Sequence, residues 1–514
     1  MVPNGPWKYF EIDKFSHHFV VKNMSPRGQQ VAEAFARNYI QYGIVKVGRI
    51  FKRAPIKVFA AKIASRNEIR FHWGQWGEFL KHIGNSGVRT EDYEIKEYGP
   101  HEITTLDRAV KSTFTPRDYQ GPVIDYMVSD EPSPKKLVQL QAGKGKSIMS
   151  MFAASRIDSR TLIFLKPQFI KKWVADLHEK MDLEEDDVTV IQGSASLMTL
   201  IDEAMNDELK AKFIIVSNKT FQNWISSYEQ KGDKLLDEGY GCSPHELMHV
   251  CKVGLRVIDE VHMDFHLNFK IDLYTHVKNA ISLSATLISD DKFVSRMQYI
   301  AYPEFMRYAG LEFDKYVHSH SLHYRVADPE SMQTTERGSN NYSHNAYEKN
   351  FYRSKKLMQD YLKLIGDQVE EHYIKRRAEG DRCLVYGASI QFCTTLAEYL
   401  RKRFPDRDVR RYVEDDVYDN LMEAEICVST VGSAGTGHDI PGLITVILTP
   451  SIASSASNIQ GFGRLRNLEG KVMIFVYFTC DDIPKHVDYY ERKELLLSGM
   501  ALTRQEVFIN QVLG

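Results

Sequence analysis

The most informative stretch of the chain is LVQLQAGKGKSIMSMFAASRI, residues 137–157. Its apolar start predicts a buried strand, its glycines predict a tight turn, and the spacing that follows predicts a helix. Strand, glycine-rich loop and helix in this order are typical of a phosphate-binding loop. Leu140 stands where the general motif has another glycine, and the alternative interpretation is a chance GKGKS in a basic surface loop.

The residue types of this loop predict an ATP site. Gly143 and Gly145, with Lys144 between them, allow backbone N–H groups to approach phosphate oxygens closely. We expect Lys146 to reach the β- and γ-phosphates and Ser147 to hold Mg²⁺. ATP and Mg²⁺ are therefore the predicted cofactors.

An acidic pair, Asp259-Glu260, follows the apolar run LRVI directly and precedes Val261-His262. Ligands of α/β folds bind at the carboxyl ends of buried strands, where this pair is expected to lie. Asp259 is predicted to complete the Mg²⁺ shell and Glu260 to orient or deprotonate the attacking water. The alternative is an ordinary acidic turn. His262 and His266 have metal-ligand spacing, but no cysteine or third ligand stands beside them.

Buried β-branched runs alternate with amphipathic helical stretches along most of the chain, which predicts parallel, doubly wound sheets. The runs in the first half include residues 161–165 and 213–217, and the pattern restarts at 383–387. We expect one α/β domain over 111–320, a polar connection over 321–345, and a second α/β domain over 346–514 that ends in a helical tail. Residues 1–110 are predicted to form a small α+β domain.

Composition excludes several classes of protein. With 43% apolar and 26% charged residues, the chain has ordinary globular usage, which excludes a mainly disordered or fibrous protein. The chain contains no run of about 18 apolar residues, so no membrane span is predicted. The start of the chain does not resemble a secretory signal. Its six cysteines form no CxxC pair, which favours a reducing compartment, the cytoplasm.

Charge is unevenly distributed along the chain. Residues 1–70 hold 13 Lys and Arg but four Asp and Glu, a local net charge of +9 in a chain whose total is −2. Such an excess suits a polyanion, because neutralised phosphates release counterions. The alternative is a solvated basic surface.

Six sequence motifs occur in the order found in superfamily 2 helicases. The resemblance to motif I lies in the loop at 142–147, that to motif II in Asp259 to His262, and that to motif III in Ser284-Ala285-Thr286. Residues 429–443 resemble motif V, and Gln460-Gly461-Phe462-Gly463-Arg464-Leu465-Arg466 resembles motif VI. Arg117-Asp118-Tyr119-Gln120 resembles the adenine-reading Q motif. The resemblance covers residues 114–480, and the basic N-terminal region and the chain length most resemble phage UvsW-type branch-migration and reannealing helicases.

This resemblance implies two RecA-like domains in tandem and a role for each motif. Arg117 and Gln120 would read adenine, while Arg464 and Arg466, with Gln460, would act on the γ-phosphate. Gly437 and Asp439 would sense the nucleotide. The residues implied to couple the phosphate site to nucleic acid are His262, Ser284 and Thr286. The residues implied to contact nucleic acid are Lys166, Gln168, Lys172, Asn218, Thr220 and Thr430.

The function implied by the resemblance is an ATP-dependent DNA helicase or translocase that remodels forks, D-loops or four-way junctions. An RNA-dependent ATPase or RNA helicase is the alternative, because the QxxGRxR spacing at Gln460 also resembles double-stranded-RNA-sensing helicases. An ATP-switched clamp, or a motor subunit of a larger complex, is a third hypothesis. Implied partners are DNA or RNA and proteins of a recombination or replication complex, in the host cytoplasm if the source is a phage.

Overall fold

The computed structural model describes residues 8–48, 50–106, 110, 114–308, 313–336, 341–434 and 439–514. These residues fall into two compact units, each with its own hydrophobic core. The first unit comprises Met1–Leu140 and Lys144–Gly310, and the second comprises Gln141–Gly143 and Leu311–Gly514.

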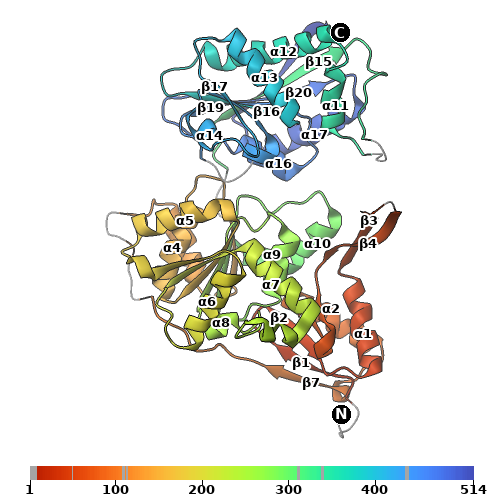
Figure 1. Ribbon diagram of the computed structural model, residues 1–514, viewed down its shortest axis with the longest axis vertical. Helices are drawn as coiled ribbons and strands as arrows, with labels where there is room; N and C mark the ends of the chain where they lie inside the picture. Colours follow the sequence, from red (N-terminus) through yellow and green to blue (C-terminus); the bar gives the residue numbers. More distant parts are fainter. Residues whose placement is uncertain are drawn as a thin grey trace. The chain divides into compact units, whose positions relative to one another are not determined.

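The first unit contains a seven-stranded, fully parallel sheet with helices around it (Figure 1). Its inner strands are short apolar runs that are almost wholly buried, as expected of a parallel sheet, whereas the edge strands are partly exposed. The strand order is β10 (Val188–Ile191), β11 (Phe213–Ser217), β9 (Thr161–Leu165), β12 (Leu255–Ile258), β13 (Asn279–Ser284), β8 (Lys135–Gln139) and β14 (Arg307–Tyr308). The helices are α3 (Gln120–Val128), α4 (Lys146–Ile157), α5 (Pro167–Lys180), α6 (Ser194–Met205), α7 (Asn218–Lys231), α8 (Leu247–Val250), α9 (Phe265–Asp272) and α10 (Lys292–Ala301).

The second unit repeats this architecture with another seven-stranded parallel sheet. The strand order is β17 (Val409–Tyr412), β18 (Ile426–Thr430), β16 (Arg382–Gly387), β19 (Leu443–Leu448), β20 (Met473–Cys480), β15 (Val317–Val326) and β21 (Thr503–Leu513). The helices are α11 (His344–Phe351), α12 (Lys355–Val369), α13 (Ile390–Arg403), α14 (Asp419–Glu423), α15 (Val431–Ala434), α16 (Ser455–Phe462) and α17 (Pro484–Leu497). The predicted doubly wound fold is thus confirmed in both halves of the chain.

Two boundaries of the second unit differ from the prediction. Strand β15 covers residues assigned to the end of the first domain and to the connection, because its pairing with β20 and β21, far along the chain, leaves no local signal. The tail was expected to be helical, but only α17 is a helix. Residues 503–513 form the edge strand β21, whose side chains are mostly exposed and therefore give no apolar run.

The N-terminal region forms a five-stranded sheet of its own, flanked by α1 (Pro26–Arg37) and α2 (Trp76–Asn85). The strand order is β5 (Ala61–Ile63), β6 (Glu68–His72), β2 (His18–Lys22), β1 (Phe10–Lys14) and β7 (Tyr93–Glu97). This confirms the predicted α+β region. Its core is continuous with that of the first parallel sheet, so the two parts form one compact unit.

A separate two-stranded sheet leaves this region. Strands β3 (Ile40–Val47) and β4 (Ile50–Val58) pair antiparallel and project from the N-terminal sheet as a hairpin (Figure 1).

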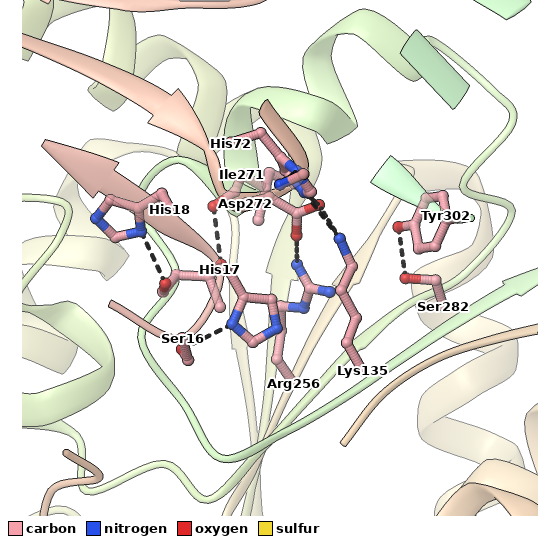
Figure 2. A network of polar contacts seen from close by, with 12 residues as sticks. Ser16, His17, His18, His72, Lys135, Arg256, Ile271, Asp272, Ser282 and Tyr302 are labelled. Carbon is pink, nitrogen blue, oxygen red and sulfur yellow. Dashed lines mark hydrogen bonds and ion pairs between the residues drawn. The ribbon is translucent and has the colours of Figure 1, made fainter. Parts of the chain in front are cut away.

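A buried charge network joins the N-terminal region to the parallel sheet (Figure 2). Asp272 of α9 accepts hydrogen bonds from Lys135 Nζ at 2.8 Å and from Arg256, and lies 3.3 Å from His72 Nε2 of β6. Burial, then the charge of Lys135, lowers the pKa of His72 to about 4, so the imidazole is neutral at pH 7. Lys135 begins β8 and Arg256 lies near the start of β12, so the network is at the amino-end edge of the sheet.

Among the described residues, no helix has the length and apolar character needed to cross a membrane.

Candidate ATP site

The glycine-rich loop lies at the opposite edge of the sheet, where β8 ends and α4 begins. Gly143 and Gly145 have φ angles of +86° and +78°, a left-handed conformation that favours glycine. A Cβ on Gly145 would lie 2.7 Å from Gln120 Nε2. The loop therefore requires glycine at 145 both for its backbone conformation and for the close approach of Gln120.

Lys146 and Ser147 occupy the first turn of α4, where the helix dipole favours an anion. Lys146 is 7% exposed, and its Nζ donates a hydrogen bond of 3.0 Å to the carbonyl of Leu140. The ammonium is thus held across the loop. Ser147 is half-buried beside it. Both residues thus lie at the start of the helix that follows the loop, and their roles toward phosphate and Mg²⁺ stay predictions.

The Q-motif residues contact the same loop. Gln120 Nε2 donates to the carbonyl of Lys144 at 3.1 Å, and the Tyr119 hydroxyl donates to that carbonyl at 3.2 Å. The Gln120 Oε1 accepts from the Arg117 backbone N–H at 2.9 Å, which fixes the orientation of the amide. The Lys144 ammonium lies 5.0 Å from the Tyr119 ring centroid. Gln120 therefore fixes the loop, and its predicted contact with adenine stays a prediction.

Asp259 lies just beyond the carboxyl end of β12, in the same unit as Lys146. Its Oδ2 accepts a 2.8 Å hydrogen bond from the indole N–H of Trp173, and its Oδ1 accepts from the backbone N–H of Glu260 at 2.9 Å. Burial, together with the negative charge of Glu260, raises the pKa of Asp259 above its ordinary value. Trp173 on α5 was not predicted, because its spacing there matched that of core residues.

Glu260 and His262 link the acidic pair to the third motif. Glu260 has a φ of +49°, a strained conformation for a residue with a side chain. His262 Nδ1 lies 3.3 Å from the Glu260 carboxylate and 2.9 Å from Ser284 Oγ. Burial, then the charge of Lys146, lowers the pKa of His262 to about 4. Ser284 Oγ also bonds the backbone of Thr286, accepting from its N–H at 3.2 Å, so the three predicted coupling residues are in fact connected.

Asn218 takes part in a second connection to the acidic turn. It is 6% exposed, and its amide donates to Asn268 Oδ1 at 3.2 Å. Asn268 in turn donates to the carbonyls of Val261 and Met263, at 3.0 and 2.7 Å. No motif or spacing singled out Asn268. The Asn218 side chain is buried, and its predicted contact with nucleic acid stays a prediction.

The other predicted nucleic-acid contacts of the first unit lie near the carboxyl ends of β9 and β11. Gln168 and Lys172 are exposed on α5. Lys166 forms a 2.8 Å ion pair with Asp264, and Thr220 Oγ1 accepts from the Gly193 N–H at 2.8 Å.

The motif residues of the second unit lie at the carboxyl ends of its strands and on α16. Arg464 is 5% exposed, and burial lowers its pKa from the ordinary value while the adjacent Tyr386 acts in the opposite direction. Arg466 Nε donates to Asp439 at 3.0 Å, which brings together two residues predicted to respond to nucleotide. Gln460 is half-buried on α16.

Two predictions concern the segment between β18 and β19. Thr430 ends β18, and its Oγ1 accepts from the Ser433 N–H at 3.1 Å. Gly437 lies outside the described residues.

The donor set of the first unit is compatible with Mg²⁺. The cation prefers oxygen ligands and retains waters and substrate phosphates, so one or two protein oxygens suffice. Asp259 supplies a buried carboxylate whose pKa is raised, partly by repulsion from Glu260, and a cation would relieve that repulsion. Ser147 supplies a hydroxyl. Within the described ranges, no group of three or more His, Cys, Asp or Glu side chains could hold a metal ion unaided.

No family model matches the chain, and no curated protein does. Solved structures do resemble it. S. cerevisiae Dbp5 bound to RNA and ADP BeF3 has 13% sequence identity and a TM-score of 0.50, covering 76% of this chain and 90% of that chain. A point variant of Dbp5 bound to the same ligands has 13% identity and a TM-score of 0.50, covering 77% and 90%. The chain therefore has the fold of two tandem RecA-like domains, preceded by a small α+β region.

Proposed function

We propose that the chain is an ATP hydrolase of the superfamily 2 helicase type that acts on nucleic acid. The observation that carries this proposal is the combination of Lys146, at the start of α4, with the Asp259–Glu260 pair at the same edge of one parallel sheet. A second RecA-like domain with the buried Arg464 is the other element that such a motor needs.

The proposed reaction uses residues already held in place. Lys146 binds the β- and γ-phosphates, and the backbone N–H groups of the loop bind their oxygens. Glu260 orients the attacking water and accepts its proton. Mg²⁺, held by Ser147 and Asp259, would neutralise charge on the phosphates. His262 is neutral at pH 7 and hydrogen-bonded to Ser284. A movement of Glu260 would therefore shift Ser284 and the rest of the third motif.

RNA is the nucleic acid that the comparisons favour, because the two structures with a TM-score of 0.50 are complexes with RNA and ADP BeF3. The spacing of motif VI, with Arg466 three residues after Gly463, supports the same choice. DNA is the second candidate. It rests on the UvsW-type resemblance and on the net charge of +9 in residues 1–70. Protein partners in a recombination or replication complex stay a prediction.

Steady-state ATP hydrolysis with matched DNA and RNA substrates tests the proposal. The substrates are single strands, blunt duplexes, forks and four-way junctions at one salt concentration. We expect at least one of them to stimulate hydrolysis, and the preferred sugar identifies the partner. Lys146→Ala should abolish hydrolysis, whereas hydrolysis that persists in this variant would disprove the assigned site.

Arg464 is tested separately. Arg464→Ala should bind ATP normally but hydrolyse it about 10³-fold more slowly, because a guanidinium that stabilises the transition state contributes at least this factor. Arg464→Lys keeps the charge but not the planar donor geometry, and should restore little of the rate. A normal rate in both variants would refute the role.

A further inference from the structure

The β3–β4 hairpin has no core of its own. It is a two-stranded sheet outside the five-stranded sheet, and none of its residues whose side chains the structure describes is fully buried. Ile44 is 77% exposed, Ile50 is 71% exposed and Phe51 is 66% exposed. Isolated two-stranded sheets are marginally stable, and clustered exposed apolar side chains mark binding surfaces. The hairpin is therefore a candidate interaction element.

The charge of the hairpin points to a polyanion. Residues 40–58 contain no Asp or Glu, and their cationic residues are Lys46, Arg49, Lys52, Arg53 and Lys57. Lys52 and Arg53 are both exposed on β4. An acidic protein surface would also attract these cations, and the binding and crosslinking measurements below distinguish it from nucleic acid.

Aromatic and cationic side chains share one face of the ribbon. Ile44 pairs with Arg53 across the two strands, so their side chains lie on the same face, as does Tyr42 two residues away. The Arg53 guanidinium lies 5.2 Å from the Tyr42 ring centroid. Phe51 is on this face too, whereas Lys52 is on the other. Stacking side chains beside phosphate-binding cations are typical of surfaces that bind nucleic acid.

The base of the hairpin is attached to the loop after the third motif. Asp291 accepts hydrogen bonds from Gln41 Nε2 at 2.8 Å and from Lys57 Nζ at 3.0 Å. The same carboxylate caps α10 through the backbone N–H of Phe293 at 2.9 Å. Asp291 lies seven residues after Ser284 in the sequence. The hairpin is thus fixed to the edge of the sheet that carries the ATP site.

Aromatic packing reinforces this attachment. Phe59, directly after β4, is fully buried. Its ring centroid lies 4.9 Å from that of Phe269 on α9 and 5.8 Å from that of Phe293 on α10. Helix α9 follows the second motif, and α10 follows the third. A displacement of either helix would therefore move the base of the hairpin.

We propose that the β3–β4 hairpin binds duplex nucleic acid at the point where the two nucleic-acid strands separate. On one face of the ribbon Arg53 would contact a phosphate and Phe51 exposed bases, and on the other face Lys52 would contact a phosphate and Ile50 exposed bases. This inference rests on the proposed function and adds to it the element that holds the duplex. A two-stranded ribbon enters the major groove of B-form DNA, whereas the A-form groove is too narrow. This argument favours DNA, the second candidate above, and we expect a larger effect with DNA forks than with RNA forks.

Equilibrium binding to fluorescent forks, measured by anisotropy without ATP, tests the proposal. The variant is Lys52→Gln with Arg53→Gln. The matched control is Arg37→Gln with Lys81→Gln, two exposed cations on α1 and α2 of the same region. Loss of two phosphate contacts should reduce the slope of log K against log salt by about 1.8 and weaken binding about 60-fold at 0.1 M salt. The control should bind as the wild type does.

A photocrosslinking amino acid at position 51 provides a second measurement that does not depend on affinity. We expect it to crosslink to nucleotides at the fork junction, whereas the same group at the exposed Phe508 of β21 should not. Wild-type affinity and salt slope in the hairpin variant, or crosslinks confined to position 508, would overturn the proposal. Hydrolysis that no nucleic acid stimulates would disprove the proposed function, while hairpin-dependent binding would still support this inference.

Discussion

Replacing Asp272 by asparagine should destabilise the first unit by about 3–5 kcal/mol, the usual cost of breaking a buried ion pair from one side. Asp272 is 1% exposed and contacts Lys135, Arg256 and His72 (Figure 2). Asparagine keeps the shape of the side chain but removes its charge. Two buried cations would then lack their shared counterion.

The two cations do not contribute equally to this cost. Burial already lowers the pKa of Lys135 to about 8, so this amine can release its proton when Asp272 is neutralised. Arg256 is 0% exposed and cannot release a proton under ordinary conditions. The destabilisation is therefore close to that of one uncompensated buried charge rather than two.

Hydrogen exchange at increasing urea concentrations measures the effect on peptides that cover β6, β8 and β12. With a urea dependence of about 1–3 kcal/mol per molar, the midpoint should fall by at least about 1 M. Asp233→Asn is the matched control, because it breaks the 3.0 Å ion pair between Asp233 and Arg66. This ion pair also joins the N-terminal region to the first parallel sheet, but it is exposed. The control should cost less than about 1 kcal/mol. Equal effects of the two variants would refute the reasoning.

Three further predictions concern single side chains. Trp173→Phe removes the N–H donor to Asp259. It should therefore raise the Mg²⁺ concentration needed for hydrolysis or lower kcat by about 10–100-fold. An unchanged Mg²⁺ titration would contradict this. Gln120→Ala should raise the KM for ATP about 5–10-fold through loss of the hydrogen bond to Lys144, and an unchanged KM would count against that role. The pKa of His72 is about 4 in the folded chain, below its value near 6.5 in the unfolded chain. Between these two pH values the unfolded chain binds an extra proton, so the free energy of unfolding falls as the pH decreases. His72→Gln should reduce that slope, by at most about 1.4 kcal/mol per pH unit, in urea titrations from pH 4 to 7.

The sequence allowed the parallel sheets to be predicted because their strands are apolar on both faces. Residues 161–165 and 213–217 coincide with β9 and β11. The glycine-rich loop between β8 and α4 could equally be predicted from the sequence, since its glycines and Lys146 have fixed spacing on a strand–loop–helix unit. The sequence order of the motifs also indicated that the fold repeats in the second half.

The features that escaped prediction depend on contacts distant in the sequence. Trp173 has the spacing of a core residue, and only its hydrogen bond to Asp259 distinguishes it. Strand β15 carries polar side chains whose partners, β20 and β21, lie far along the chain. Asp272 is an ordinary helix-end carboxylate until Lys135 and Arg256 are brought beside it. Local periodicity contains no signal for such pairings.

The position of β15 between β20 and β21 affects how the protein is made on the ribosome. Strand β15 ends at Val326, but its neighbours begin at Met473 and Thr503, so both of its edges stay unpaired during synthesis of the intervening residues. The first parallel sheet is complete by Tyr308 and can fold while the second half emerges. A nascent chain stopped near Met500 would have a folded first unit and an open β15 edge, the kind of edge that recruits chaperones or other strands.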